Sequence, residues 1–279
     1  MSRRGPREPV ARGGEGRPEP SEVPPAVAVV GLAGLAIFVV PLFGLLGAVP
    51  WTGLLRELVT PEVGTALWLS LVSSFSATAV ALVLGVPLAW LQARGSFPGR
   101  RLLRTFTAFP LVLPPVVGGV ALLLAFGRRG LVGRLLESAL GLRLPFSLAG
   151  VVLAQTFVAM PFLVLAVEGG FRTVDRRLEE AAQTLGASRW TRFTRVTLPL
   201  LRPSLAAGAL LCWARALGEF GATITFAGNI PGTTQTMPLA VYLALESRPE
   251  AAIVLSIVML VLSGLVIVGL RESWLGLRP

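Results

Sequence analysis

Lysine and histidine are both missing from this 279-residue chain, and it holds a single cysteine. Without lysine, the chain cannot contain a P-loop, whose lysine contacts nucleotide phosphates. Without histidine, it has neither a Ser-His-Asp triad nor a histidine metal site. Cys212 cannot form an internal disulfide, and its place in an apolar run predicts a small packing residue. We therefore expect no catalytic residues and no metal site.

Charge of either sign is also scarce. Charged residues make up 14% of the chain, against about 25% in a typical soluble domain. Hydrophobic residues make up 53%, and the mean hydropathy is +0.73. All 25 basic residues are arginines, and they lie mostly between apolar runs, where membrane orientation requires positive charge. We expect an integral membrane protein surrounded by lipid, with no nucleic-acid partner.

Six membrane-spanning segments are predicted. Five are uncharged runs near or above the roughly 20 residues that cross the hydrocarbon core. They lie within residues 26–49, 62–94, 104–128, 143–168 and 251–270. The fifth in chain order begins near Leu198 and contains Arg215 and Glu219. The first run exceeds the length of a signal-peptide core and contains Pro41, so we expect a retained anchor helix.

The arginines predict the orientation of these segments. With the N-terminus inside, 18 arginines lie on the cytoplasmic side and six outside, which agrees with the positive-inside rule. Both termini are therefore expected in the cytoplasm, although the basic loop 128–143 falls outside. Residues 1–24 contain few apolar side chains and are expected to be a disordered cytoplasmic tail, followed by a transmembrane domain over residues 25–279.

Two segments have distinctive compositions. The second gathers small residues that allow close helix approach, namely Ser70, Ser73, Ser74, Ser76 and Ala77. The third contains Pro110, Pro114 and Pro115, which predict a bent helix that faces protein. The prolines are compatible with a simple structural kink or with a role in gating.

The charged loop 168–198 predicts two short helices on the cytoplasmic side. The first carries an apolar stripe with helical spacing, formed by Leu178, Ala181, Ala182 and Leu185. Gly186 is well placed to end this helix. In the second helix, Trp190 and Phe193 share one side, which suits the membrane interface. From its periodicity alone, the stripe either packs under its own bundle or contacts another protein.

The wider pattern resembles a known family. Residues 180–199 read EAAQTLGASRWTRFTRVTLP. This stretch resembles the EAA motif of ABC importer permeases at Glu180, Ala181, Ala182, Gly186, Leu198 and Pro199. Val196 stands where the family often has isoleucine. The resemblance implies an all-α, polytopic type I ABC importer permease fold with about six transmembrane helices, a core over residues 64–270 and a cytoplasmic coupling helix in loop 168–198. It also implies that this helix docks on a separate ATPase subunit, which binds ATP-Mg and leaves this chain without a cofactor.

A later stretch narrows the expected cargo. Residues 215–232 read RALGEFGATITFAGNIPG, and residues 233–242 read TTQTMPLAVY. Both are similar to molybdate permeases. The resemblance implies molybdate import across the bacterial cytoplasmic membrane by a permease homodimer, two ATP-binding cassette subunits and an extracytoplasmic molybdate-binding protein. Sulfate permeases share part of this pattern, so sulfate or thiosulfate remains an alternative, as does tungstate.

The same stretch contains the candidate translocation residues. Arg215 lies thirteen residues after Arg202, or roughly 20 Å along a helix, which puts it deep in the membrane. It is one helical turn before Glu219, so the two either form a structural pair or line the pathway or its gate. An intramembrane enzyme is a remote alternative, because it would need more ionisable groups at that depth. Residues 220–245 are uncharged but rich in Gly, Thr, Asn and Pro, which predicts a partly re-entrant segment at the external mouth. Its candidate polar contacts are Thr223, Thr225, Asn229 and Thr233.

Overall fold

The computed structural model describes residues 24–274. Every regular element in this part of the chain is helical, as predicted. The elements are α1 (Pro25–Gly47), α2 (Leu54–Leu58), α3 (Pro61–Arg94), α4 (Arg100–Val112), α5 (Pro115–Phe126), α6 (Leu131–Leu140), α7 (Leu148–Thr173), α8 (Arg176–Thr184), α9 (Arg189–Arg192), the π-helix η1 (Phe193–Thr197), α10 (Leu198–Leu200), α11 (Arg202–Leu217), α12 (Gly221–Ala227), α13 (Met237–Ser247) and α14 (Pro249–Trp274). The tail predicted over residues 1–24 lies outside the described residues except for Pro24.

The chain divides into two units. The first ends at Gly47, and the second begins at Ala48. The described part of the first unit is α1, an apolar helix of 23 residues that contains Pro41. Its length and composition are sufficient to cross a membrane. The structure therefore agrees with the predicted extent of the first segment.

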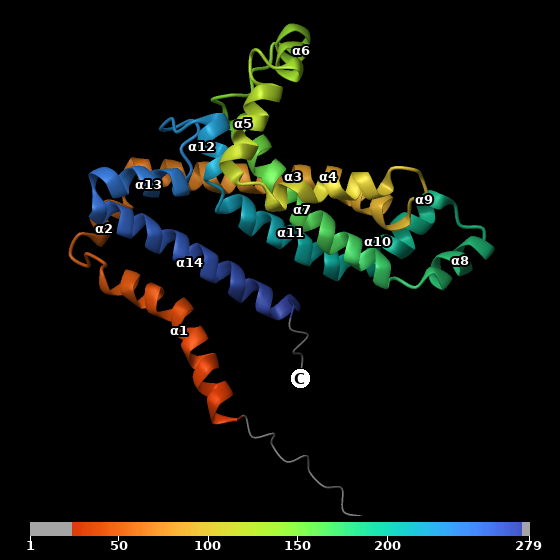
Figure 1. Ribbon diagram of the computed structural model, residues 1–279, viewed down its shortest axis with the longest axis horizontal. Coiled ribbons are helices and arrows are strands. Elements are labelled where there is room, and N and C mark those ends of the chain that lie inside the picture. Colours follow the sequence, from red (N-terminus) through yellow and green to blue (C-terminus); the bar gives the residue numbers. More distant parts are fainter. Residues whose placement is uncertain (1–23, 275–279) are drawn as a thin grey trace, which may run out of the picture. The chain divides into compact units, whose positions relative to one another are not determined.

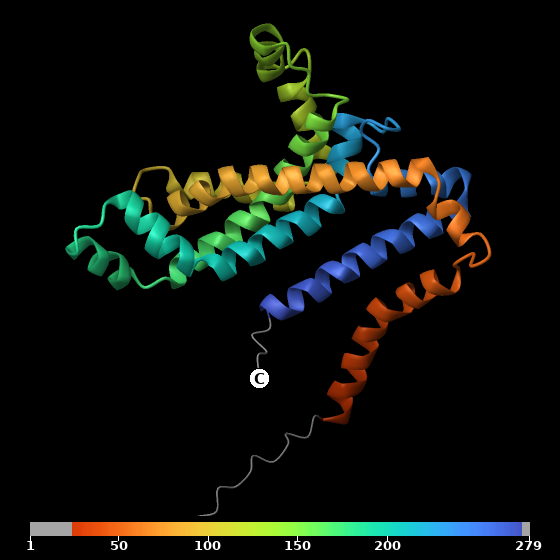
Figure 2. The same ribbon diagram turned by 180° about the vertical axis from the view of Figure 1, so that it is seen from behind.

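The core of the second unit is built by α3, α7 and α11, which lie side by side in both views (Figures 1 and 2). The small residues of α3 permit this approach, because Ser70, Ser73, Ser74 and Ala77 are completely buried. Ser74 Oγ accepts a hydrogen bond of 2.9 Å from the indole N–H of Trp213 in α11. The serines thus provide both close packing and hydrogen bonds inside an otherwise apolar bundle.

The described part of the chain contains up to six candidate membrane spans, judged by helix length and apolar composition. Four are single helices, namely α1, α3, α7 and the Pro249–Val266 part of α14. The others are bent pairs: α5 with α6, which meet at 49°, and Arg189–Leu200 with α11, which meet at 71°. The predicted number is therefore reached only when each bent pair is taken as one span.

The boundaries of the third segment were predicted incorrectly. Residues 104–128 do not form one bent helix, because the chain breaks between α4 and α5 at Leu113 and Pro114. Proline lacks an N–H and clashes with the preceding turn, so consecutive prolines end α4 and begin α5. The region expected to be an external loop, residues 128–143, contributes α6.

Residues 220–245 contain more helix than expected. They form α12 and most of α13, and irregular backbone is confined to the turn between these two helices. Gly228 and Gly232 adopt φ angles of +74° and +75° in this turn. Glycine adopts such angles without the steric cost that a Cβ would add, so the turn reverses the chain locally while helices continue on both sides.

Candidate functional site

Helix α8 begins and ends with well-formed caps. Asp175 accepts a hydrogen bond from the backbone N–H of Arg177 at its start. At its end, Gly186 has φ +83°, the N–H of Gly186 bonds to Gln183 O, and the N–H of Ala187 bonds to Ala182 O. This pair of bonds is the Schellman motif, which suits glycine at its left-handed position. Gly186 therefore ends α8 as its position in the sequence predicted.

The apolar stripe of α8 remains accessible. Leu178 is 48% exposed and Leu185 is 88% exposed, and Ala181 is exposed as well. Within the described chain, α8 contacts chiefly α9 and η1, and it lies at one end of the bundle (Figure 1). The stripe does not pack under its own bundle, so this alternative loses its support and a face for another protein remains.

Glu179 ties α8 to the rest of the bundle, a role that the sequence analysis missed. Its Oε1 accepts a hydrogen bond of 3.0 Å from the hydroxyl of Thr197 in η1. The same oxygen lies 3.6 Å from Nη2 of Arg94 at the end of α3. One carboxylate therefore joins three elements of the loop and the core. Its position off the apolar stripe did not distinguish it from Glu180, which is also off the stripe and is exposed, so the sequence held no specific signal for these contacts.

Leu198 and Pro199 lie where the loop turns into the membrane-spanning part. They belong to the three-residue α10, with Pro199 in its first turn. The next helix, α11, begins at Arg202 after the 71° bend. Proline fits the first turn of a helix because the missing N–H has no partner there. The first residues of the motif, Glu180 to Ala182, thus lie in α8, whereas the last two, Leu198 and Pro199, lie at the bend.

Arg215 and Glu219 form an ion pair where α11 ends. Arg215 Nη1 lies 2.5 Å from Glu219 Oε2, and the Glu219 side chain is only 1% exposed. Glu219 Oε1 also accepts a hydrogen bond of 2.8 Å from the backbone N–H of Ala222 in the first turn of α12. The carboxylate thus balances the charge of Arg215 and accepts a hydrogen bond from an N–H group at the start of α12, which has no partner within its own helix. The predicted ion pair is present, but it is not intrahelical, because α11 ends at Leu217 and Glu219 lies in the junction with α12. The second contact of Glu219 was not revealed by spacing alone.

The four neutral candidate residues occupy different surroundings. Thr223 is completely buried, and its hydroxyl has no hydrogen-bond partner within residues 24–274, whereas the Thr225 hydroxyl donates to Gly221 O over 2.8 Å. Asn229 is half-buried and its Oδ1 has no partner in the described chain. Thr233 is exposed. These side chains therefore do not form one continuous lining within this chain.

Helix α12 approaches α5 closely, and glycine makes this possible. A Cβ at Gly119 would lie 2.7 Å from Thr225 Cβ and 2.9 Å from Ala222 O. Such contacts are shorter than van der Waals separation, so only glycine fits. Gly119 was not predicted from the sequence, although adjacent glycines in an apolar run are a signal for close helix packing.

Gln155 in α7 is a third residue that was not predicted from the sequence. It is completely buried, and neither atom of its amide has a hydrogen-bond partner in the described chain. A buried polar group without a partner costs about 1–3 kcal/mol, so native proteins seldom retain one without a use for it. The available signal was an amide side chain in the middle of an apolar run.

Comparisons with known proteins agree with this architecture. The family described as binding-protein-dependent transport system inner membrane component matches residues 81–273. The chain is 46% identical over 250 residues to the Molybdenum transport system permease protein ModB of Mycobacterium tuberculosis, covering 90% of this chain and 94% of that protein. It is 35% identical over 233 residues to a probable sulfate transport system permease protein cysT of Marchantia polymorpha, covering 82% and 81%.

The fold itself also has a solved counterpart. A bacterial ABC transporter involved in the import of the polysaccharide alginate matches with a TM-score of 0.69 at 18% identity, covering 89% of this chain and 93% of that one. This likeness shows the type I ABC importer permease fold. Because the family match covers more than half of the sequence, the chain belongs to the family of binding-protein-dependent transport system inner membrane components.

Proposed function

We propose that this chain is the membrane-spanning permease subunit of an ABC importer that carries molybdate across the bacterial cytoplasmic membrane. The observation that carries the cargo is the 46% identity to a molybdenum permease along nine-tenths of the chain. The sulfate permease relative is less similar, at 35%. Sulfate, thiosulfate and tungstate are therefore the competitors that an experiment must include.

The accessible stripe of α8 supports a coupling role. Leu178, Ala181, Ala182 and Leu185 present a narrow face that a groove on an ATPase subunit can approach closely. Because the chain contains no lysine, it has no P-loop of its own, and ATP-Mg is bound by the partner. Glu180 lies on the other side of α8 from the stripe and is exposed, so its part in docking is assigned through the family motif.

The complete importer contains two copies of this permease, two ATPase subunits on the cytoplasmic side and a molybdate-binding protein outside. Both termini of the permease lie in the cytoplasm, as the distribution of arginines favours. Closure of the ATPase pair on ATP displaces α8. Contacts of Glu179 with Arg94 and Thr197 support transmission of this displacement to α3 and η1. The bend before α11 then passes it to the segment that holds Arg215.

Candidate contacts for the passing anion lie beyond the bend. Arg215 and Glu219 mark the transition from α11 to α12, and neutral donors follow them, namely Thr223, Thr225, Asn229 and Thr233. Neutral donors suit a pathway, because conduction needs contacts weak enough to release the ion. In this proposal the second copy of the permease completes the lining.

Reconstitution in vesicles tests the function. The full chain is incorporated with its ATPase subunits, ATP is enclosed, and the binding protein is added outside with labelled molybdate. We expect ATP-dependent accumulation of molybdate, inhibited by tungstate and only weakly by a matched concentration of sulfate. A preparation without ATPase subunits serves as the control. Sulfate accumulation with equal or higher efficiency contradicts the cargo, and accumulation without ATPase subunits contradicts the coupling.

A further inference from the structure

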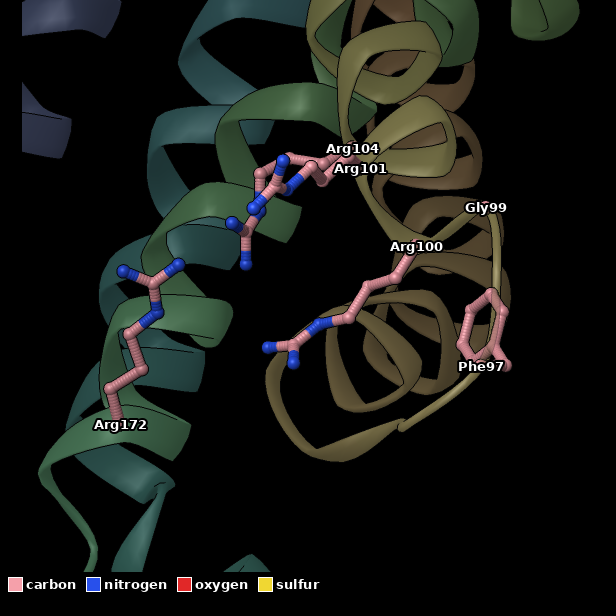
Figure 3. Close-up of a pocket in the computed structure, with 6 residues that line it drawn as sticks. All are labelled: Phe97, Gly99, Arg100, Arg101, Arg104 and Arg172. Atoms are coloured by element: carbon pink, nitrogen blue, oxygen red, sulfur yellow. The ribbon is translucent and has the colours of Figure 1, made fainter.

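Four arginine side chains surround a cavity of about 460 Å³ between α4 and α7. Three come from the start of α4 and one from the last turn of α7. Figure 3 shows Arg100, Arg101 and Arg104 extending from α4 toward α7, on which Arg172 lies. The cavity is lined by Phe97, Gly99, Arg100, Arg101, Arg104 and Arg172. None of these residues belongs to the coupling motif or to the candidate pathway.

Positive charge exceeds negative charge at this cavity. Glu168 is the one carboxylate that pairs with the four arginines among the described residues, and it contacts Arg104 and Arg172, the latter over 2.9 Å. Two of the four guanidinium groups therefore share one carboxylate, and the other two have no carboxylate partner among the described residues. A cluster of like charges raises the electrostatic energy of the folded chain, so an anion between α4 and α7 would relieve the repulsion.

Several donors at the cavity have no partner among residues 24–274. Arg100 uses Nε and Nη2 to donate to the backbone oxygens of Gln92 and Ala93, over 2.7 and 3.1 Å. Arg101 is exposed, and its guanidinium makes no ion pair or hydrogen bond with the described residues. The buried Nε of Arg104 has no acceptor among the described residues. Guanidinium groups present their N–H donors in a planar fork that matches tetrahedral oxyanions.

The backbone reinforces this preference. Helix α4 has 13 residues, its first turn borders the cavity, and no side chain caps its start. The N-terminus of a helix carries partial positive charge and unpaired N–H groups, which favour an anion. Gly99 reaches this position with φ +90°, so the loop turns directly into the helix start.

We propose that this arginine cavity binds a divalent tetrahedral oxyanion of the cargo class, molybdate, on the inner side of the membrane. The assignment of side and cargo rests on the proposed function, whereas the anion site rests on the side chains themselves. The cavity lies at the ends of α3, α4 and α7 that carry the arginines counted as cytoplasmic. An imported oxyanion would meet it after release, where it bridges α4 and α7.

Titration of molybdate into the purified full-length chain in neutral detergent and chloride buffer tests the site by calorimetry. We expect saturable binding, weakened about tenfold or more by Arg101→Gln or Arg172→Gln, because each removes charge-assisted hydrogen bonds. Arg101 has no partner to lose in the part of the chain that the structure describes, and Glu168 keeps Arg104 when Arg172 is replaced, so both variants are expected to fold. Arg195→Gln is the matched control, because Arg195 is exposed and outside the cavity. Equal affinities in all four proteins, or no binding, overturn the proposal.

The phosphate group of a lipid is also an oxyanion that the arginines could bind, so a separate experiment must distinguish it from molybdate. The titration is repeated in nanodiscs of phosphatidylcholine and of phosphatidylglycerol. We expect similar dissociation constants in both, whereas loss of molybdate binding in phosphatidylglycerol assigns the cavity to lipid and overturns the cargo. The measurement uses neither ATP nor partner subunits. Absent binding with intact vesicle uptake therefore contradicts only this site, and failed uptake with intact binding contradicts only the proposed function.

Discussion

Arg215 and Glu219 join the end of α11 to the start of α12 through an ion pair of 2.5 Å. Glu219 is buried and also accepts from the backbone N–H of Ala222, so the carboxylate serves two helices. The pair has a structural role, and its contact with a passing anion stays a prediction.

Replacing Arg215 alone is expected to destabilise the protein. In Arg215→Met the buried carboxylate of Glu219 loses its counter-charge, which costs roughly 3–5 kcal/mol when one partner of a buried pair is removed. Thermal unfolding in detergent, followed by tryptophan fluorescence, measures the effect. The double variant Arg215→Met with Glu219→Gln removes both charges and keeps an acceptor for Ala222, so most of the stability should return. An unchanged melting temperature in the single variant contradicts the structural role.

Gly186 should tolerate asparagine better than alanine. Nothing lies within 4 Å of a Cβ built at this position, so the cost of Gly186→Ala comes from its φ of +83° and amounts to about 1–2 kcal/mol. Fraying of the end of α8 is expected to raise the ATP hydrolysed per molybdate imported in reconstituted vesicles. Gly186→Asn is the control, because asparagine adopts left-handed backbone more readily. Identical ratios in the alanine variant and the wild type argue against a role for this helix end in coupling.

A bulky side chain on the α8 stripe should prevent docking without unfolding the chain. Ala181 is exposed, so Ala181→Trp is accommodated by the permease but obstructs a partner that approaches closely. Co-purification of the ATPase subunit and its affinity for the permease are the measurements. Arg176→Trp places the same side chain on the opposite, also exposed, side of α8 and is expected to have little effect. Equal loss of affinity in both variants indicates a general disturbance of the loop and contradicts a specific docking face.

The contact between α5 and α12 should be sensitive to a single methyl group. Gly119→Ala places a Cβ 2.7 Å from Thr225 Cβ, and overpacking of this kind costs typically 1–3 kcal/mol. The melting temperature of the purified permease should fall. Gly64→Ala in α3 is the matched control, because no atom lies within 4 Å of its Cβ and alanine favours the helix by about 0.5–1 kcal/mol. If both variants melt like the wild type, α5 and α12 are not packed as closely as described.

The sequence alone identified features that depend on local or one-dimensional information. Uncharged runs long enough to cross a bilayer predicted a helical membrane protein, because length and hydropathy decide that property without knowledge of packing. The spacing of Leu178, Ala181, Ala182 and Leu185 predicted α8, and Gly186 predicted its end. The i,i+4 spacing of Arg215 and Glu219 predicted their possible pairing.

Features that depend on distant residues required the tertiary structure. Pro114 signalled a bend, but only the structure showed that α4 separates from α5 and that α5 continues toward α6 through a 49° turn. Glu179 contacts Arg94, which lies 85 positions earlier in the sequence. The arginine cavity likewise brings Arg100 close to Arg172. Hydropathy and periodicity describe which face of a helix is apolar, but they do not determine its neighbour. Which helices become neighbours is decided by the packing of small residues such as Ser74 and Gly119. The sequence was therefore sufficient to predict the fold class, whereas the arginine cavity became visible only in the tertiary structure, because its residues come from separate helices.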